Sequence, residues 1–268
     1  MPRFKLTIEY AGTRYSGWQI QKNARTVQGE LDKAVRGVTG RRDFELYGSG
    51  RTDAGVHALG QVAHLDVSTS LPPATLRQRI NDDLPADINV LDAKIVPHRF
   101  HARHDAVARA YFYQLATRRA AFAKPYVWWI REPLDLGRMR DAAGAFVGMR
   151  DFKSFTQEDE DGEAARSTLV LVERLAIVED GALVLLRIEG SHFLWKMVRR
   201  IVGVLVEVGR GDMTAPDAAA LLASSSAAPA KLTAPASGLF LDRVYYAGDP
   251  RNAEVHPATP LRASVQAG

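Results

Sequence analysis

Apolar and polar residues alternate with two different periods along this chain, and these periods predict strands and helices. The segment FKLTIEY (4–10) alternates residue by residue, which is typical of a half-buried strand. In RTVQGELDKAVRGV (25–38), Thr26 is a suitable N-cap, and the apolar residues after it recur at helical spacing. Similar patterns in the rest of the first half predict strands at 60–67 and 88–96 and a helix at 73–84.

The second half of the chain repeats this mixture of elements. Its predicted strands are 108–117, two strands within 169–190 that join at a glycine-containing turn (179–181), and 238–246; its predicted helices are 135–148, 194–209 and 215–224. A parallel sheet needs a crossover connection, usually a helix, between successive strands, and this chain has too few such connections for its number of strands. We therefore expect an α+β fold with a mostly antiparallel central sheet flanked by helices. The two halves show no residue-level repeat, so an internal duplication stays a suspicion.

The helix predicted at 194–209 is the most apolar one and also carries three basic residues. On a helical wheel, Lys196 and Arg200 lie opposite the apolar face, and Arg199 lies at its boundary. Arg199 is then either a snorkelling side chain or a partly buried guanidinium that pairs with a carboxylate.

The composition is that of an ordinary globular protein, with 268 residues, 46% of them hydrophobic and 25% charged. This length suits one large domain or two domains of ordinary size. No apolar run approaches the ~18–20 residues that cross a bilayer, and the N-terminus lacks the apolar core of a signal peptide. The absence of cysteine excludes disulfides, cysteine-ligated zinc and thiol nucleophiles, and together these features favour the cytoplasm.

The charge is unevenly distributed. The formal net charge is +4, but the segment QEDEDGE (157–163) alone holds five acidic residues, so the rest of the chain carries +9. Such a surplus suits a polyanionic partner, although charge alone equally serves solubility.

The most unusual stretch is GSGRTDAGVHALG (48–60), with four glycines around Arg51 and Asp53. It lacks the Gly-Lys-Ser/Thr of a P-loop, and Asp53 stands where a dinucleotide-binding fingerprint needs its third glycine. Two interpretations remain. Asp53 caps a turn that has Gly55 in a left-handed conformation, or it is a nucleophilic or acid–base carboxylate on a rigid loop, with Arg51 available for a phosphate.

A second segment, 98–119, interleaves five arginines with aromatic residues, a combination that binds phosphates and stacks on unpaired bases. Alternation places Tyr111 and Tyr113 on one face of the strand and Phe112 on the other, so some of these rings must belong to the core. Histidines recur every third residue at His98, His101 and His104. Without helical context or a clear carboxylate partner, this spacing favours loop histidines near phosphate over a metal site.

Taken together, these residues resemble the tRNA pseudouridine synthase A family over almost the whole chain. The most specific segment is Gly-Arg-Thr-Asp-Ala-Gly-Val-His at 50–57. Further matching segments follow in the family's order: 17–21, 26–28, 81 with 84–85, 100–103, 111–113, 151–155, 197–203 and 238–241. Three features depart from the family pattern, namely the acidic segment 157–163, the tail beyond Asp249, and Arg200, where an asparagine is expected.

The resemblance implies a pseudouridine synthase fold of two halves related by a pseudo-twofold axis. The expected halves are 1–105, with the Asp53 loop, and 106–247, with Tyr111 and Arg199. The proline-containing tail at 248–268 is expected to be disordered.

The resemblance also implies an isomerase that converts uridine to pseudouridine at positions 38–40 of the anticodon stem-loop of tRNA. Asp53 is the expected catalytic nucleophile, paired with Arg199. Tyr111 is expected to stack on the flipped-out base, and Arg51 and His57 to bind the substrate. The implied partners are tRNA and a second copy of the chain in a homodimer, with no membrane.

The chemistry agrees with these expectations, because the isomerisation has no net redox change and needs no metal, nucleotide or other cofactor. Three routes remain open to Asp53, which are addition to uracil C6, attack on ribose C1′, and proton abstraction at C2′. A hydrolytic glycosidase would need a second carboxylate, such as Asp105 or Asp242, brought close by the fold. A non-enzymatic RNA-binding protein would need the basic and aromatic residues but not Asp53.

Overall fold

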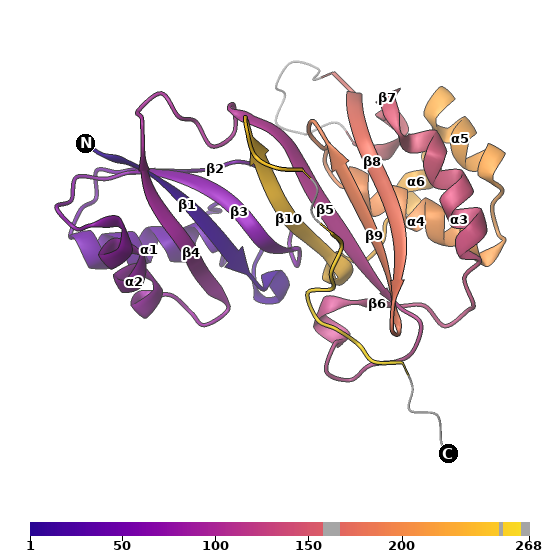
Figure 1. The fold of residues 1–268 in the computed structure, drawn as a ribbon, viewed down its shortest axis with the longest axis horizontal. Coiled ribbons are helices and arrows are strands. Elements are labelled where there is room, and N and C mark those ends of the chain that lie inside the picture. The colour runs from indigo at the N-terminus through magenta and orange to yellow at the C-terminus, as the bar shows by residue number, and fades with distance from the viewer. Residues whose placement is uncertain (158–166, 252–253, 264–268) are drawn as a thin grey trace. The chain divides into compact units, whose positions relative to one another are not determined.

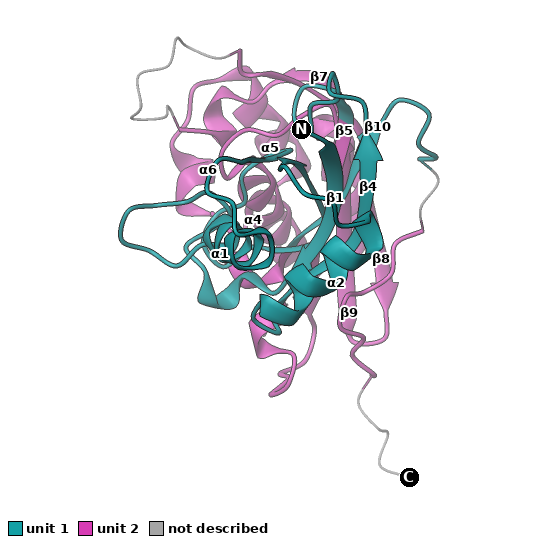
Figure 2. Ribbon diagram, turned by 90° about the vertical axis from the view of Figure 1, so that its left-hand side faces the viewer, with its two compact units in different colours: residues 1–107, 240–251 teal, residues 108–239, 252–268 magenta. Residues whose placement is uncertain are grey.

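The computed structural model describes residues 1–157, 167–251 and 254–263, so the acidic residues of 157–163 lie outside the described ranges. The chain divides into two compact units (Figure 2). Unit 1 comprises Met1–Val107 and Phe240–Arg251, and unit 2 comprises Ala108–Leu239 and Asn252–Gly268. The last strand, which the sequence suggested for the C-terminal half, is thus grouped with unit 1.

Unit 1 is built on β1 (Arg3–Tyr10), which pairs antiparallel with β3 (His57–Asp66) on one side and β4 (Ile88–Val96) on the other (Figure 1). β2 (Glu45–Gly48) adds an antiparallel partner to β3, and β10 (Leu239–Tyr246) pairs parallel with it. The predicted alternation of β1 is confirmed, since every second side chain is buried.

The helices of unit 1 are α1 (Val27–Thr39) and α2 (Pro73–Asp83), which pack beside each other. Thr26 is the N-cap of α1, as predicted, and its side chain accepts a hydrogen bond from the Gly29 N–H.

Unit 2 contains four antiparallel strands in the order β5 (Ala106–Ala116), β9 (Leu183–Gly190), β8 (Leu169–Asp180), β7 (Gly148–Asp151), and β6 (Trp128–Trp129) pairs parallel with β5. Its helices are α3 (Leu136–Ala143), α4 (Met197–Arg210), α5 (Ala215–Ala223) and α6 (Ala228–Lys231). The predicted turn between β8 and β9 is confirmed, with Gly181 at φ +60°. The predicted α+β class with mostly antiparallel pairing is therefore confirmed.

Helix α4 differs from its prediction in burial. We expected one apolar face with Arg200 opposite, yet Arg200 is only 3% exposed and most residues of the helix are buried. The reason is that α4 is covered on more than one side. Val198, Ile201 and Leu205 face side chains of β8 and β9, while α3 and α6 pack against other parts of the helix.

The tail also differs from its prediction, because the described part, 254–263, packs on unit 2. The Leu261 carbonyl accepts a hydrogen bond from the Ala182 N–H at 2.9 Å. Val255 and Leu261 cover a buried apolar cluster that includes Val127 and Leu185. These apolar contacts hold the segment together with the Ala258 N–H, which donates to the Gln114 Oε1 at 2.9 Å.

The remaining differences are short elements. The sequence patterns did not predict β2, β6, β7 or α6, none of which exceeds four residues, because so few residues carry no measurable period. In the described ranges, no helix is both long and apolar enough to cross a membrane.

Candidate active site

The loop that carries Arg51 and Asp53 connects β2 to β3 and is held by backbone hydrogen bonds to the segment after β1. The Thr52 carbonyl accepts from the Trp18 N–H at 3.1 Å, and the Gly55 N–H donates to the Tyr15 carbonyl at 3.2 Å. Within the loop, the Val56 N–H donates to the Asp53 carbonyl at 3.1 Å. The backbone on both sides of Asp53 is therefore fixed.

Glycines allow this close approach of two backbones. A Cβ atom on Gly17, whose φ is +93°, would lie 2.5 Å from the Thr52 carbonyl oxygen. Gly55 has φ +79°, so the left-handed turn predicted after Asp53 is confirmed. The turn and the carboxylate are thus parts of one rigid loop rather than alternatives.

Side-chain hydrogen bonds also hold the Asp53 loop in place. The Thr52 hydroxyl and the Tyr10 hydroxyl are 2.8 Å apart and hydrogen-bonded. Gln61 of β3 donates from its amide to the Gly50 carbonyl at 3.0 Å and accepts from the Ser49 hydroxyl at 2.7 Å. Asp53 itself is half-buried and Arg51 is exposed. The arrangement presents one carboxylate and one guanidinium from a preorganised backbone.

His57 lies at the start of β3 and is only 1% exposed. Its Nδ1 accepts a hydrogen bond from the Gly12 N–H at 3.0 Å, and its ring stacks on Phe240 with centroids 4.7 Å apart. These contacts brace the Asp53 loop. A direct contact of His57 with substrate stays a prediction.

Tyr111 lies in β5 of unit 2, opposite Ile188 of β9. Its ring is half-buried and meets Phe193 edge to face, with centroids 5.3 Å apart. Phe112 and Tyr113 are both buried, so the core includes one ring from each face of the strand. Of the three aromatic residues, Tyr111 therefore has the most accessible ring for stacking.

Arg199 lies in the first turn of α4 and is half-buried, and its pairing with a carboxylate stays a prediction. Its Nε donates to the Ala234 carbonyl at 2.7 Å, and the Ala234 N–H donates to the Arg199 carbonyl at 3.1 Å. The adjacent Arg200 is buried, and among the described residues its Nε has no hydrogen-bond partner. Burial, and then the charge of Arg199, lower the pKa of Arg200.

The three regularly spaced histidines lie in the loop between β4 and β5. The Nδ1 atom of His101 accepts hydrogen bonds from the backbone N–H groups of Arg103 and His104, at 3.1 and 3.2 Å. No group of three or more histidine, cysteine or acidic side chains in the described part of the chain is arranged to hold a metal ion.

The sequence patterns did not predict that the segment after β1 packs against the Asp53 loop. Gly12 and Gly17 allow this contact, because a Cβ atom at either position would clash with the backbone of the loop. The signal was present as two glycines five residues apart, outside any predicted element.

Comparison with known proteins supplies the family. A family model described as tRNA pseudouridine synthase matches residues 6–105 and 142–247. Two similar proteins are both named tRNA pseudouridine synthase A. The one from Rhodopseudomonas palustris is 42% identical over 249 residues, covering 92% of this chain and 100% of its own. The one from Halalkalibacterium halodurans is 40% identical over 245 residues, covering 91% of this chain and 92% of its own.

Among solved structures, a Cbf5-Nop10-Gar1 complex is similar at a TM-score of 0.33 and 11% identity. That match covers 75% of this chain and 54% of the other, and so slight a likeness does not bear on the fold.

Proposed function

This chain belongs to the tRNA pseudouridine synthase family, and we propose that it converts uridine to pseudouridine in the anticodon stem-loop of tRNA, with Asp53 as the nucleophile. The observation that carries the proposal is the rigid loop that presents the half-buried carboxylate of Asp53. A carboxylate that only capped a turn would not need a backbone locked to a second segment. A carboxylate that must meet one atom of a substrate does need it.

The reaction breaks the N1–C1′ bond of uridine and joins C5 to C1′. The proton on C5 is released and N1 becomes an N–H, so electrons balance without a redox partner. A single carboxylate is sufficient for this exchange, whether it attacks C6 or C1′ or removes the C2′ proton. Asp53 is that carboxylate in the proposal, and it acts on a uridine that has left its base stack.

The proposal gives roles to two further residues, Tyr111 and Arg199. The accessible ring of Tyr111 stacks on the extruded uracil, which returns about 1–3 kcal/mol of the cost of unstacking. The guanidinium of Arg199, whose Nε donates to the Ala234 carbonyl, pairs with Asp53 in the proposal. The enzyme acts as a homodimer, and light scattering of the purified protein tests that part of the proposal.

The test uses unmodified tRNA with tritium at uracil C5. The wild-type protein should release tritium, and Asp53→Asn should abolish release while tRNA binding changes little, because the amide is not nucleophilic. Asp43→Asn, a change of the same kind at an exposed position, is the matched control and should keep full release. The proposal fails if the wild-type protein releases no tritium or if Asp53→Asn releases it at the wild-type rate.

Arg199→Ala in the same assay tests the pairing with Asp53. Turnover should fall by more than tRNA binding weakens, because the variant loses the cation that pairs with the catalytic carboxylate in the proposal. Equal losses in turnover and binding would instead make Arg199 a phosphate contact. Mapping pseudouridines in the reacted tRNA then identifies the modified positions.

A further inference from the structure

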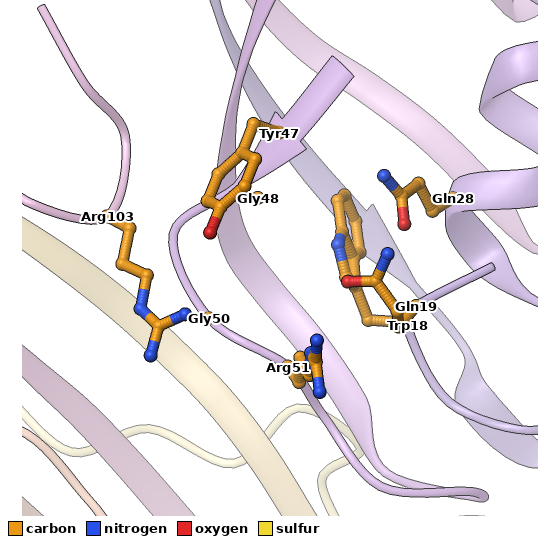
Figure 3. A pocket seen from close by; sticks show the side chains of 8 residues that line it. All are labelled: Trp18, Gln19, Gln28, Tyr47, Gly48, Gly50, Arg51 and Arg103. Carbon is orange, nitrogen blue, oxygen red and sulfur yellow. The ribbon is translucent and has the colours of Figure 1, made fainter. Parts of the chain in front are cut away.

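Unit 2 has an exposed surface at the end of β5 that the proposed reaction does not use. It consists of residues 117–131, which include the loop from β5 to β6 and β6 itself, together with Arg262 of the tail (Figure 1). We call it the basic aromatic surface. The pocket that opens beside the Asp53 loop in unit 1 is a separate feature (Figure 3), and because Arg51 lines it, it belongs to the site already described.

Two aromatic side chains of the basic aromatic surface face the solvent. Phe122 is 99% exposed and Trp129 is 42% exposed, whereas Phe112 and Tyr113 of the adjoining strand are buried. A ring as exposed as that of Phe122 buries no apolar area and so adds nothing to the stability of the fold. Its position is therefore explained by a partner rather than by the core.

The loop that carries Phe122 has a fixed backbone. The next residue, Ala123, belongs to the buried apolar cluster that the tail covers. The Ala123 carbonyl accepts a hydrogen bond from the Tyr126 N–H at 2.8 Å, and the Tyr126 carbonyl accepts one from the side-chain amide of Gln114 at 2.8 Å. The exposed ring is thus presented by a preorganised loop, so that binding a partner there orders few groups.

The surroundings of the two rings are basic. The segment TRRAAFAKPYVWWIR (117–131) has four basic residues and no acidic one. The guanidinium carbon of Arg119 lies 5.8 Å from the centroid of the Trp129 ring, which is a cation–π distance. The Arg118 Nε donates to the Arg262 carbonyl at 3.0 Å, and this bond brings a fifth basic residue to the surface.

Acidic residues on neighbouring segments pair with other arginines. Glu132, directly after the surface, lies 3.3 Å from Arg210, and Glu179 of the β8–β9 turn lies 3.4 Å from Arg140. Asp180, in the same turn, opposes the five positive charges of the surface. The surface therefore keeps a positive balance.

Exposed rings among cations on a fixed backbone match an unpaired stretch of nucleic acid. Bases of any sequence stack on aromatic faces, while arginine and lysine bind the phosphates that connect them. A second copy of the chain fits this surface less well, because a twofold interface would bring like charges against each other. Charge complementarity thus favours RNA as the occupant.

We propose that the basic aromatic surface binds an unpaired nucleotide of the tRNA other than the target uridine, with its base on Phe122 and its phosphates at Arg119 and Lys124. The proposal rests on the proposed function, because it takes tRNA as the substrate. Tyr111 and Ala116 are five residues apart on β5, which is about 17 Å, and the surface begins after Ala116. The nucleotide on Phe122 is therefore distinct from the one that stacks on Tyr111.

The test of the ring titrates the full-length protein with unmodified tRNA. Phe122→Ala should raise the dissociation constant at least about 5-fold, the lower end of the effect of removing one stacking ring. Phe122→Trp keeps an aromatic face and should bind within about 2-fold of the wild-type protein, whereas Phe122→Leu keeps only apolar character and should bind like Phe122→Ala. Met149→Ala, at another exposed apolar position of unit 2, is the matched control and should leave binding unchanged.

The test of the charges measures binding at several salt concentrations. Arg119→Gln and Lys124→Gln should each reduce the slope of the logarithm of the binding constant against the logarithm of the salt concentration by about one, because each removes a phosphate contact. Arg138→Gln removes an equal charge from an exposed position of α3 and should keep the wild-type slope.

Three results would overturn the RNA surface. They are wild-type affinity of Phe122→Ala for tRNA, full recovery of binding by Phe122→Leu, and a lower mass of Phe122→Ala in light scattering, which would assign the ring to a contact between copies. Tritium release by the wild-type protein is measured in parallel. Release with no effect of Phe122→Ala on binding removes only this surface, whereas the full effect on binding without release keeps the surface and removes the proposed isomerase.

Discussion

The imidazole of His64 is a single buried group that couples stability to pH. It is 1% exposed, and its Nδ1 accepts a hydrogen bond from the Ala102 N–H at 3.2 Å. Burial lowers its pKa to about 4, with further contributions from Arg3 and His101 and an opposing one from Asp66. The unfolded chain, with a histidine pKa near 6.5, therefore binds the proton more readily than the folded chain.

We predict that the free energy of unfolding falls as the pH is lowered from about 6.5 to about 4. Above this window His64 is neutral in both states and the native contacts are intact. Within it the unfolded state takes up the proton first, which costs up to about 3 kcal/mol of stability. Urea unfolding at successive pH values measures this loss.

His64→Gln keeps an acceptor for the Ala102 N–H but cannot titrate, so its stability should depend less on pH across the same window. His256→Gln, at an exposed position, is the control for replacing a histidine. An identical pH slope in His64→Gln and the wild-type protein would contradict the prediction.

At the scale of the element, α4 shows how a helix can be constrained by a segment that no local pattern connects with it. A Cβ atom on Gly203, in the middle of α4, would lie 1.6 Å from the Leu232 carbonyl oxygen. The backbone of 232–234 therefore contacts the helix directly, and it also holds Arg199 through Ala234. Gly203 sets the distance between the two segments.

Gly203→Ala should lower the free energy of unfolding by about 1–3 kcal/mol, because a methyl group must push the Leu232 backbone away. The same shift should reduce turnover through Arg199. Gly144→Ala is the matched control, since a Cβ atom there meets no other atom within 4 Å and the residue has helical φ and ψ. That change should be neutral or stabilising by about 0.4–1 kcal/mol. Chemical denaturation measures the free energy of unfolding of both variants. Equal values for Gly203→Ala and Gly144→Ala would contradict the close contact between Gly203 and Leu232.

At the scale of the whole molecule, the acidic segment opposes the charge of the rest. The net charge is +4, and replacing Glu158, Asp159, Glu160, Asp161 and Glu163 with their amides would raise it to +9. This variant should bind tRNA several-fold more tightly at low salt, because a polyanion is attracted by the larger net charge. The two proteins should bind alike in high salt, where the added attraction is screened. Equal dissociation constants in a salt titration would contradict this effect.

Local patterns were sufficient to predict most of the elements and the motif of the candidate site. The alternation in 4–10, the N-cap at Thr26 and the glycine turn at 179–181 can each be recognised from a few neighbouring residues. Likewise, Asp53 was identifiable because its neighbours in sequence are distinctive. Signals of this kind can be recognised without the tertiary structure, because the residues that carry them are neighbours in the sequence.

Contacts between distant segments had to come from the tertiary structure. The spacing of apolar residues along the sequence predicts neither the burial of Arg200 nor the packing of Leu261 on unit 2. Both depend on which distant segments pack against these residues. The pocket beside Asp53 is the clearest case, since Trp18, Tyr47 and Arg103 are far apart in the chain. Their proximity is a property of how β1, β2 and the loop after β4 pack, and packing is decided by the sum of many long-range contacts rather than by any local sequence.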